Sequence, residues 1–224
     1  MQLPHYQAQT VRQQRRRLYS IAGRAYPGVT TILSATKPPE ARVSLQKWRQ
    51  AVGHETAHRI TVQASSAGTR LHKYIAAHLR RETTALPNDL DDYWASIEPV
   101  LAETEEVLLV EGAVWHDQGF AGIPDALVRY RGQLCLCDWK TARRPKQPEW
   151  LQDYWLQVAA AYGAAVNQVY DDYGIRVEHA LIAIALADQP AQTFWLTPQA
   201  LEQYWQGFQQ RLQQYQNRQR WGLI

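Results

Sequence analysis

The chain has 224 residues, 46% of them hydrophobic, which fits a single globular domain over residues 1–224 with a sizeable core. No run of 18 apolar residues occurs, and the polar start lacks the apolar core of a signal peptide, so we expect no membrane partner. The net charge is +3, and six cations precede the first acidic residue, Glu40, which leaves −3 on the remainder. Positive charge gathered at one end favours contact with a polyanion, and we expect residues 1–16 to form a weakly ordered basic arm.

Helical and strand-like patterns alternate along the chain. Ser66 is placed to cap a helix, and Pro198 stands where a proline is tolerated in the first helical turn. The expected elements are an extended stretch over 18–33, helices over 43–64, 66–81, 89–103, 148–170 and 198–218, and strands over 107–115, 120–130, 133–141, 176–187 and 193–196.

The strands between residues 107 and 141 have the clearest chemical meaning. Arg131-Gly132 predicts a two-residue hairpin connection, because Gly132 can adopt the positive φ that such turns need. The residues that follow, 134–137, are Leu-Cys-Leu-Cys, so this strand is expected to be buried on both faces. It leads directly into Asp138 and Lys140, which point to the same side because side chains alternate along a strand.

A second carboxylate is expected beside these two residues. Asp125 lies thirteen residues before Asp138, and a hairpin centred on Gly132 places the two strands side by side. A D-x-K triplet alone is typical of a solvated ion pair. A buried carboxylate and ammonium, however, are costly unless they are paired or bound to a metal. Two carboxylates suit Mg²⁺ or Mn²⁺, and Lys140 beside the ion could position a water or balance developing negative charge.

The two cysteines, Cys135 and Cys137, share one face of the same strand. They are too close for a normal disulfide and too few for a four-cysteine cluster, so we expect buried apolar side chains and no iron–sulfur cluster.

Three segments resemble one nuclease family. Residues 122–125 read Gly-Ile-Pro-Asp, residues 138–140 read Asp-Trp-Lys, and residues 68–72 read Gly-Thr-Arg-Leu-His. Together they resemble the PD-(D/E)XK nucleases of the RecB exonuclease type, and within these the mitochondrial genome maintenance exonucleases with their bacterial and phage relatives. The resemblance spans about residues 26–162. It implies an α/β fold in which a mixed central sheet of four to six strands is flanked by helices, as in restriction endonucleases.

The same resemblance implies further site residues. It places His72 among the metal ligands with Asp125 and Asp138, and it makes the main-chain carbonyl of Trp139 a further candidate ligand. Glu111 matches a glutamate that relatives carry on the preceding strand, although an exposed strand glutamate is an equally good interpretation. The glutamate that the family often has four residues after the histidine is replaced here by Ala76.

Contacts with the substrate are expected after the D-x-K strand. Thr141, Arg143 and Arg144 open a basic loop suited to gripping a phosphate backbone. RecB-type nucleases carry Q-x-x-x-Y on the next helix, but here Gln157 and Tyr162 are five residues apart. In a regular helix that spacing turns the side chains about 140° apart, so we expect them not to share a face.

These features predict a Mg²⁺- or Mn²⁺-dependent deoxyribonuclease that hydrolyses phosphodiester bonds from single-stranded DNA ends or flaps in replication, repair or genome maintenance. A structure-specific or restriction-like endonuclease and a non-catalytic DNA-binding subunit of the same fold are the alternatives. An Arg-rich start could be a transit peptide, but strand-like sequence begins at once and serine is scarce. We therefore expect a cytoplasmic, nucleoid-associated protein rather than a mitochondrial one.

Overall fold

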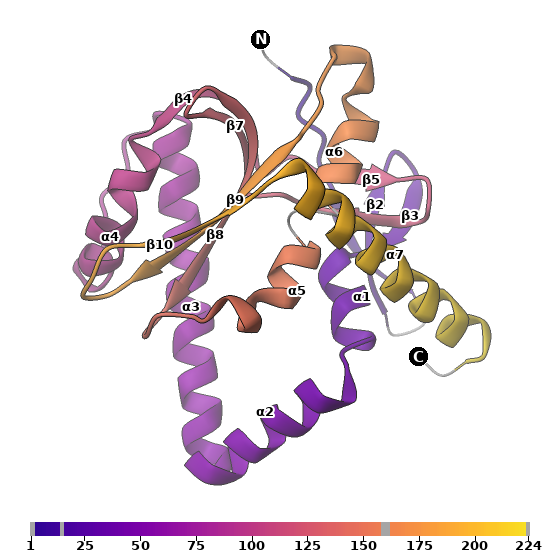
Figure 1. The fold of residues 1–224 in the computed structure, drawn as a ribbon, viewed down its shortest axis with the longest axis horizontal. Coiled ribbons are helices and arrows are strands. Elements are labelled where there is room, and N and C mark those ends of the chain that lie inside the picture. Colours follow the sequence, from indigo (N-terminus) through magenta and orange to yellow (C-terminus); the bar gives the residue numbers. More distant parts are fainter. Residues whose placement is uncertain (1–2, 14–15, 158–161, 223–224) are drawn as a thin grey trace.

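A computed structural model describes residues 3–13, 16–157 and 162–222 of the chain. Its centre is a five-stranded sheet in the order β10-β9-β8-β7-β4 (Figure 1). Only the β8–β9 pair is parallel, so the sheet is mixed, as predicted. The strands are β4 (Thr104–Val110), β7 (Ala126–Tyr130), β8 (Gln133–Ala142), β9 (His179–Leu186) and β10 (Gln192–Leu196).

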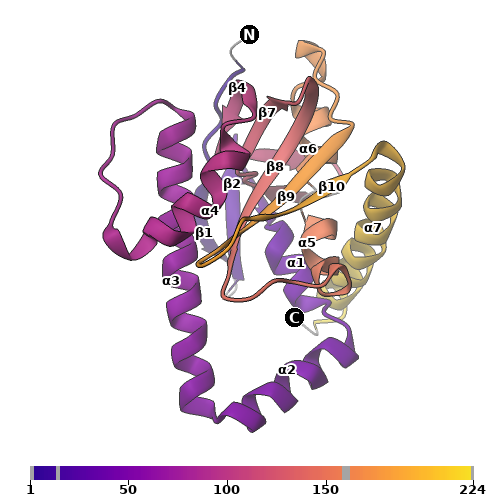
Figure 2. The ribbon, with the colours of Figure 1, turned by 60° about the vertical axis from the view of Figure 1, so that its left-hand side comes forward.

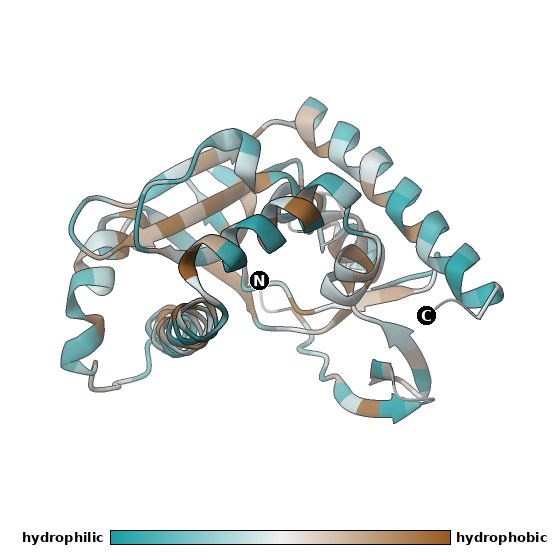
Figure 3. Cartoon of the chain, turned by 90° about the horizontal axis from the view of Figure 1, so that it is seen from below, coloured by the Kyte–Doolittle hydropathy of each residue, from teal (hydrophilic) through white to brown (hydrophobic). Residues whose placement is uncertain are grey.

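Helices cover both faces of this sheet (Figure 2). One face packs on α3 (His54–Leu79) and α4 (Asp91–Leu101). The other packs on α1 (Val29–Ala35), α6 (Gly163–Val169) and α7 (Pro198–Arg220). Figure 3 shows apolar residues along the central strands and a largely polar α7. The α/β fold class is confirmed.

The β7–β8 hairpin forms as predicted. Arg131 and Gly132 both have positive φ, 48° and 77°, as a type I′ turn requires. On β8, residues 135–139 are all buried, which confirms a strand covered on both faces. Cys135 and Cys137 are buried free cysteines, as expected.

The N-terminal segment differs from the prediction. Residues 3–13 are not a loose arm: Leu3 is buried, the Tyr170 hydroxyl donates to the Pro4 carbonyl, and Gln9–Gln13 forms β1. This strand pairs with β2 (Arg16–Ile21), which pairs with β3 (Arg24–Pro27) in a small antiparallel sheet. Extended structure ends there rather than at Leu33, because Val29, Ile32 and Leu33 bury one face of α1 at helical spacing.

The next helix boundary also moves. α2 (Pro39–Val52) ends at Gly53, because a φ of 83° at this residue is incompatible with a continuing α-helix. α3 then runs without interruption past Ser66. Ser66 is therefore an internal helical residue and not a cap. α2 buries none of its residues, and Figures 1 and 2 show α2 and the start of α3 projecting from the sheet.

Two predicted strands are each divided. The chain leaves the sheet after β4, forms the separate hairpin of β5 (Val114–His116) and β6 (Phe120–Gly122), and re-enters at β7. The chain turns out of the sheet at Glu111, directly after β4, where φ is 53°.

The helix predicted over 148–170 is likewise not continuous. It consists of the 3₁₀ turn η2 (Pro148–Leu151), α5 (Gln152–Trp155) and α6, with Leu156, Gln157 and Tyr162 in π-helical conformation. Residues 158–161 lie outside the described part. The helix predicted over 89–103 corresponds to the 3₁₀ turn η1 (Asn88–Leu90) followed by α4. A further 3₁₀ turn, η4 (Asp171–Tyr173), follows α6, and Thr197 caps the start of α7. None of the described helices is long and apolar enough to span a membrane.

Candidate active site

Asp125 is held against the backbone of β8. It directly precedes β7, whose first residue, Ala126, pairs with Cys137. The main-chain N–H of Trp139 donates to Asp125 Oδ2 at 2.8 Å. The Asp125 carboxylate therefore lies beside the backbone between Asp138 and Lys140, which confirms that the hairpin brings the three residues together.

Asp138 and Lys140 form an ion pair on one face of β8 through Asp138 Oδ2 and Lys140 Nζ. The Asp138 side chain is 2% exposed and the Lys140 side chain 17%. Burial raises the pKa of Asp138 to about 6, helped by the charge of Asp125 and opposed by Lys140. Burial lowers the pKa of Lys140, but the charges of the two carboxylates outweigh it, so the pKa stays above its usual value. A buried negative centre with one cation at its edge results.

His72 reaches the same centre from α3. Its Nδ1 lies 3.4 Å from Asp125 Oδ1. Burial lowers the pKa of His72, but the hydrogen bond to Asp125 and that carboxylate's charge outweigh it, so the pKa is raised. Burial by itself would raise the pKa of Asp125. The contacts with His72, Lys140 and the Trp139 N–H outweigh burial, so the pKa of Asp125 is lowered. The histidine predicted from the Gly-Thr-x-x-His segment thus contacts a site carboxylate.

The glycine of that segment has a packing reason. A Cβ on Gly68 would lie 3.2 Å from the Thr141 hydroxyl oxygen, tighter than most such contacts. The absence of a side chain at Gly68 lets α3 approach the end of β8, which brings His72 within reach of Asp125. Thr141 is therefore a packing partner of α3 in this structure.

Glu111 lies at the rim. Glu111, His72, Asp125 and Trp139 line one small pocket, together with Ala76. Glu111 Oε2 pairs with the Arg80 guanidinium at 3.1 Å, and its main-chain N–H donates to the Asp125 carbonyl at 3.1 Å. Glu111 thus faces the site as one interpretation predicted, while its carboxylate is engaged by an arginine.

The segment after β8 places an aromatic ring beside Lys140. Lys140 Nζ lies 5.2 Å from the centre of the Tyr154 ring, a cation–π contact. Tyr154 was not among the predicted site residues; its position three residues before Gln157, on the same helical face, is the signal that could have found it.

The prediction that Gln157 and Tyr162 point apart is wrong. Gln157 Nε2 donates to the Tyr162 hydroxyl at 3.2 Å. Residues 157 and 162 are π-helical, and a π-helix brings positions i and i+5 together. Tyr162 is buried, and burial raises the pKa of its hydroxyl well above the usual range.

Tyr162 also explains the glycine of Gly-Ile-Pro-Asp. A Cβ on Gly122 would lie 2.1 Å from Tyr162 Cε1, which is an impossible contact. The ring therefore occupies space that only a glycine leaves open, three residues from Asp125.

The basic loop after β8 is exposed. Arg143 and Arg144 are both solvent-accessible, and the Arg143 guanidinium donates to Gln63 Oε1 on α3 at 3.0 Å. Neither arginine contacts a site carboxylate among the described interactions.

The site offers a divalent cation the carboxylate oxygens of Asp125 and Asp138 and the imidazole of His72. Carboxylate oxygens suit both Mg²⁺ and Mn²⁺. Buried Asp138 Oδ2 receives no hydrogen bond from the described residues and is held by the Lys140 ion pair. The residues thus fit such an ion by chemistry. Among the described residues, however, no three His, Cys, Asp or Glu side chains are spaced to hold a metal ion.

Comparison with known proteins gives three relatives of one kind. The chain is 30% identical over 204 residues to mitochondrial genome maintenance exonuclease 1 of Mus musculus, covering 87% of this chain and 60% of that protein. It is 29% identical over 202 residues to the Homo sapiens protein, covering 84% of this chain and 58% of that protein. It is 29% identical over 213 residues to the Xenopus tropicalis protein, covering 88% of this chain and 59% of that protein. The chain therefore spans about 60% of the length of these relatives, and the predicted resemblance is confirmed.

No protein-family model matches the chain. Among solved structures, an alkaline exonuclease (LHK-Exo) from Laribacter hongkongensis is 16% identical, with 67% of this chain and 82% of that chain covered. The TM-score is 0.33.

Proposed function

Because the chain is a homologue of the mitochondrial genome maintenance exonucleases, we propose that it is a metal-dependent DNA exonuclease. It hydrolyses phosphodiester bonds from single-stranded ends or flaps. The observation that carries the proposal is the buried group of Asp125, Asp138 and Lys140 at the β7–β8 hairpin, with His72 against it. Buried or half-buried carboxylates are costly unless they are paired or bound to a metal, and a divalent ion would add to the single positive charge that Lys140 supplies to two of them.

Asp125, Asp138 and His72 would hold the ion, Mg²⁺ or Mn²⁺. When bound, such an ion lowers the pKa of a water and polarises a phosphoryl oxygen. The protein's own residues orient these groups. The Trp139 N–H fixes the Asp125 carboxylate at 2.8 Å, and burial of Asp138 keeps competing water away from its oxygen.

Lys140 has a separate role in this proposal. Its ammonium lies at the carboxylates, 17% exposed, with the Tyr154 ring on its other side. A fixed positive charge at that position stabilises the negative charge that develops on phosphorus, and it can hold the attacking water. Arg143 and Arg144 would contact the phosphate backbone from the adjoining loop. Gln157 would contact the DNA strand, with the buried Tyr162 hydroxyl holding its side chain.

The test is digestion of end-labelled linear and circular single-stranded DNA, with Mg²⁺, with Mn²⁺ and with EDTA. The proposal expects shortening of linear DNA only, and only with metal. Cutting of circles would establish an endonuclease, and binding without cutting would establish a non-catalytic subunit.

The matched variants are Asp138→Asn and Asp89→Asn. Asp138 lies in the site, whereas Asp89 pairs with Arg70 on the surface. Asp138→Asn should abolish cleavage and leave DNA binding intact, because a charged ligand is lost while repulsion of phosphate falls. Asp89→Asn should cleave normally. Cleavage by Asp138→Asn within tenfold of wild type would overturn the assignment.

A further inference from the structure

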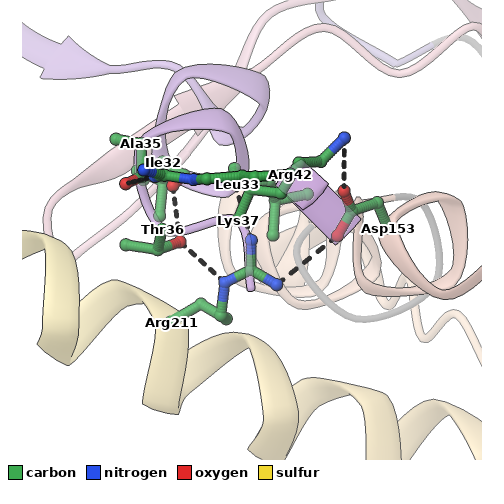
Figure 4. Close-up of polar contacts among 8 residues, drawn as sticks. All are labelled: Ile32, Leu33, Ala35, Thr36, Lys37, Arg42, Asp153 and Arg211. Atoms are coloured by element: carbon green, nitrogen blue, oxygen red, sulfur yellow. Dashed lines mark hydrogen bonds and ion pairs between the residues drawn. The ribbon is translucent and has the colours of Figure 1, made fainter. Parts of the chain in front are cut away.

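A buried arginine lies apart from the carboxylates, at the junction of α7, α1 and α5. Arg211 on α7 is 9% exposed. Its Nε donates to Thr36 Oγ1 at 2.7 Å, and its second amino group donates to the Leu33 carbonyl at 2.5 Å (Figure 4). The Leu33 carbonyl is one of the last four of α1, which have no partner within the helix, and Thr36 is the residue that follows α1.

The remaining amino group of Arg211 turns to α5. It lies 3.4 Å from Asp153 Oδ1, and the other Asp153 oxygen lies 3.6 Å from Lys37 Nζ (Figure 4). Each Asp153 oxygen therefore faces one cation, from α7 and from the α1–α2 connection. The planar Arg211 guanidinium contacts three groups at once and so links α5 to the end of α1.

The position of α5 matters because of the next residue. Tyr154 follows Asp153, and its ring is the one that lies against Lys140 Nζ. α5 is only four residues long and is followed by π-helical residues. Trp155 and Leu156 pack against the core, and Asp153 adds the polar contacts that join α5 to α7 and α1.

We propose that Arg211 is a positioning residue for Lys140, acting through Asp153 and Tyr154. The inference rests on the proposed nuclease function for its meaning, but its geometry can be tested without activity. A merely structural role would hold α7 to the body of the protein and leave the Tyr154–Lys140 contact unchanged.

The chain offers a matched control on the same helix. Arg218 also lies on α7 and also donates to the end of α1, at the Ala35 carbonyl, but it has no described contact with Asp153. Arg211→Lys and Arg218→Lys thus both weaken the contact between α7 and α1, while only the first disturbs Asp153. Asp153→Asn breaks the same ion pair from its other end, together with the Lys37 pair, and leaves the Arg211 contacts with α1 in place.

The first measurement is NMR of protein labelled with ¹³C-lysine, without metal or DNA. The Tyr154 ring should shift the Lys140 ε-methylene signal, which is assigned by its loss in Lys140→Arg. Arg211→Lys and Asp153→Asn should move this signal toward the unshifted position, and Arg218→Lys should leave it in place.

The second measurement is single-turnover cleavage at saturating DNA and metal. Arg211→Lys and Asp153→Asn should lower the rate about 10- to 100-fold, as for a misplaced group of this kind, with DNA affinity unchanged. Arg218→Lys should cleave at the wild-type rate. Adding Arg211→Lys to Tyr154→Leu should cause no further loss, because the path is already broken.

A lysine signal and a cleavage rate in Arg211→Lys equal to those of Arg218→Lys would overturn the inference and leave a structural clamp. If Arg211→Lys fails to fold, Asp153→Asn decides by the same two measurements. If the wild type does not cleave DNA, the proposed function fails, and the NMR comparison still decides whether Arg211 positions Lys140.

Discussion

The sharpest prediction concerns Lys140, whose ion pair with Asp138 offers a competing explanation for its presence. Lys140→Ala removes the only described partner of Asp138 Oδ2, and the Asp138 side chain is 2% exposed. Breaking a buried pair by removing one partner typically costs about 3–5 kcal/mol, because the other charge is left uncompensated. In EDTA, thermal and urea unfolding should therefore show a marked loss of stability.

Divalent metal should reverse part of this loss. A ligand at about 100 times its Kd stabilises a protein by about 2.7 kcal/mol. Lys140→Ala should gain more than the wild type at equal Mg²⁺, because a competing cation has been removed from Asp138. Titration of Mg²⁺ followed by the unfolding temperature checks this, with Lys73→Ala, an exposed lysine of α3, as the control that should change nothing.

The rate at saturating metal separates the two explanations. If Lys140 stabilises charge on phosphorus or holds the water, its removal should lower the single-turnover rate roughly 10²–10³-fold, as for one preorganised electrostatic contact. Lys140→Arg should not restore it, because the planar guanidinium cannot occupy the place of a point charge. A Lys140→Ala protein that cleaves at the wild-type rate in saturating Mg²⁺ would remove the lysine from the mechanism.

Three other predictions address packing, capping and substrate contact. Gly122→Ala should destabilise the fold by about 1–3 kcal/mol and slow cleavage, because the added Cβ overlaps the Tyr162 ring. In the control Gly163→Ala the added Cβ meets only an ordinary 3.9 Å contact, so urea unfolding should show little change. Thr197→Ala should cost about 0.5–2 kcal/mol by removing the side-chain cap of α7, with the cleavage rate of the folded protein unchanged, and a lower rate would contradict a purely capping role. Arg143→Gln with Arg144→Gln should weaken single-strand binding for every sequence and flatten its salt dependence by about 0.7 slope units per lost contact, whereas an unchanged slope would show that both are merely solvated.

Much of the candidate site is encoded in local sequence. The alternation of a buried strand fixes that Asp138 and Lys140 share a face, and the Arg131-Gly132 turn fixes that Asp125 lies beside them. Both features depend on neighbours a few residues away. The order of helical and strand-like segments also follows from local periodicity, whereas the mixed sheet with flanking helices was implied by the resemblance to the RecB-type nucleases.

Boundaries set by competing local signals were less predictable. Ser66 is a good helix cap in isolation, but α3 runs through it although residues 61–66 are all exposed, and the break falls at Gly53 instead. The segment 3–13 has little order of its own in the sequence pattern; pairing of β1 with β2 and burial of Leu3 supply it.

The sequence by itself therefore determined which residues carry charge at the buried hairpin and on which strand face they stand. Only the tertiary structure decided how His72, Tyr154 and Tyr162 meet that hairpin, because each arrives from another element through packing. The close approach at Gly68, the π-helical turn around Gln157 and the clamp of Arg211 have no local signature. Their geometry depends on contacts between residues up to 178 positions apart, and periodicity within one segment carries no information about such distances.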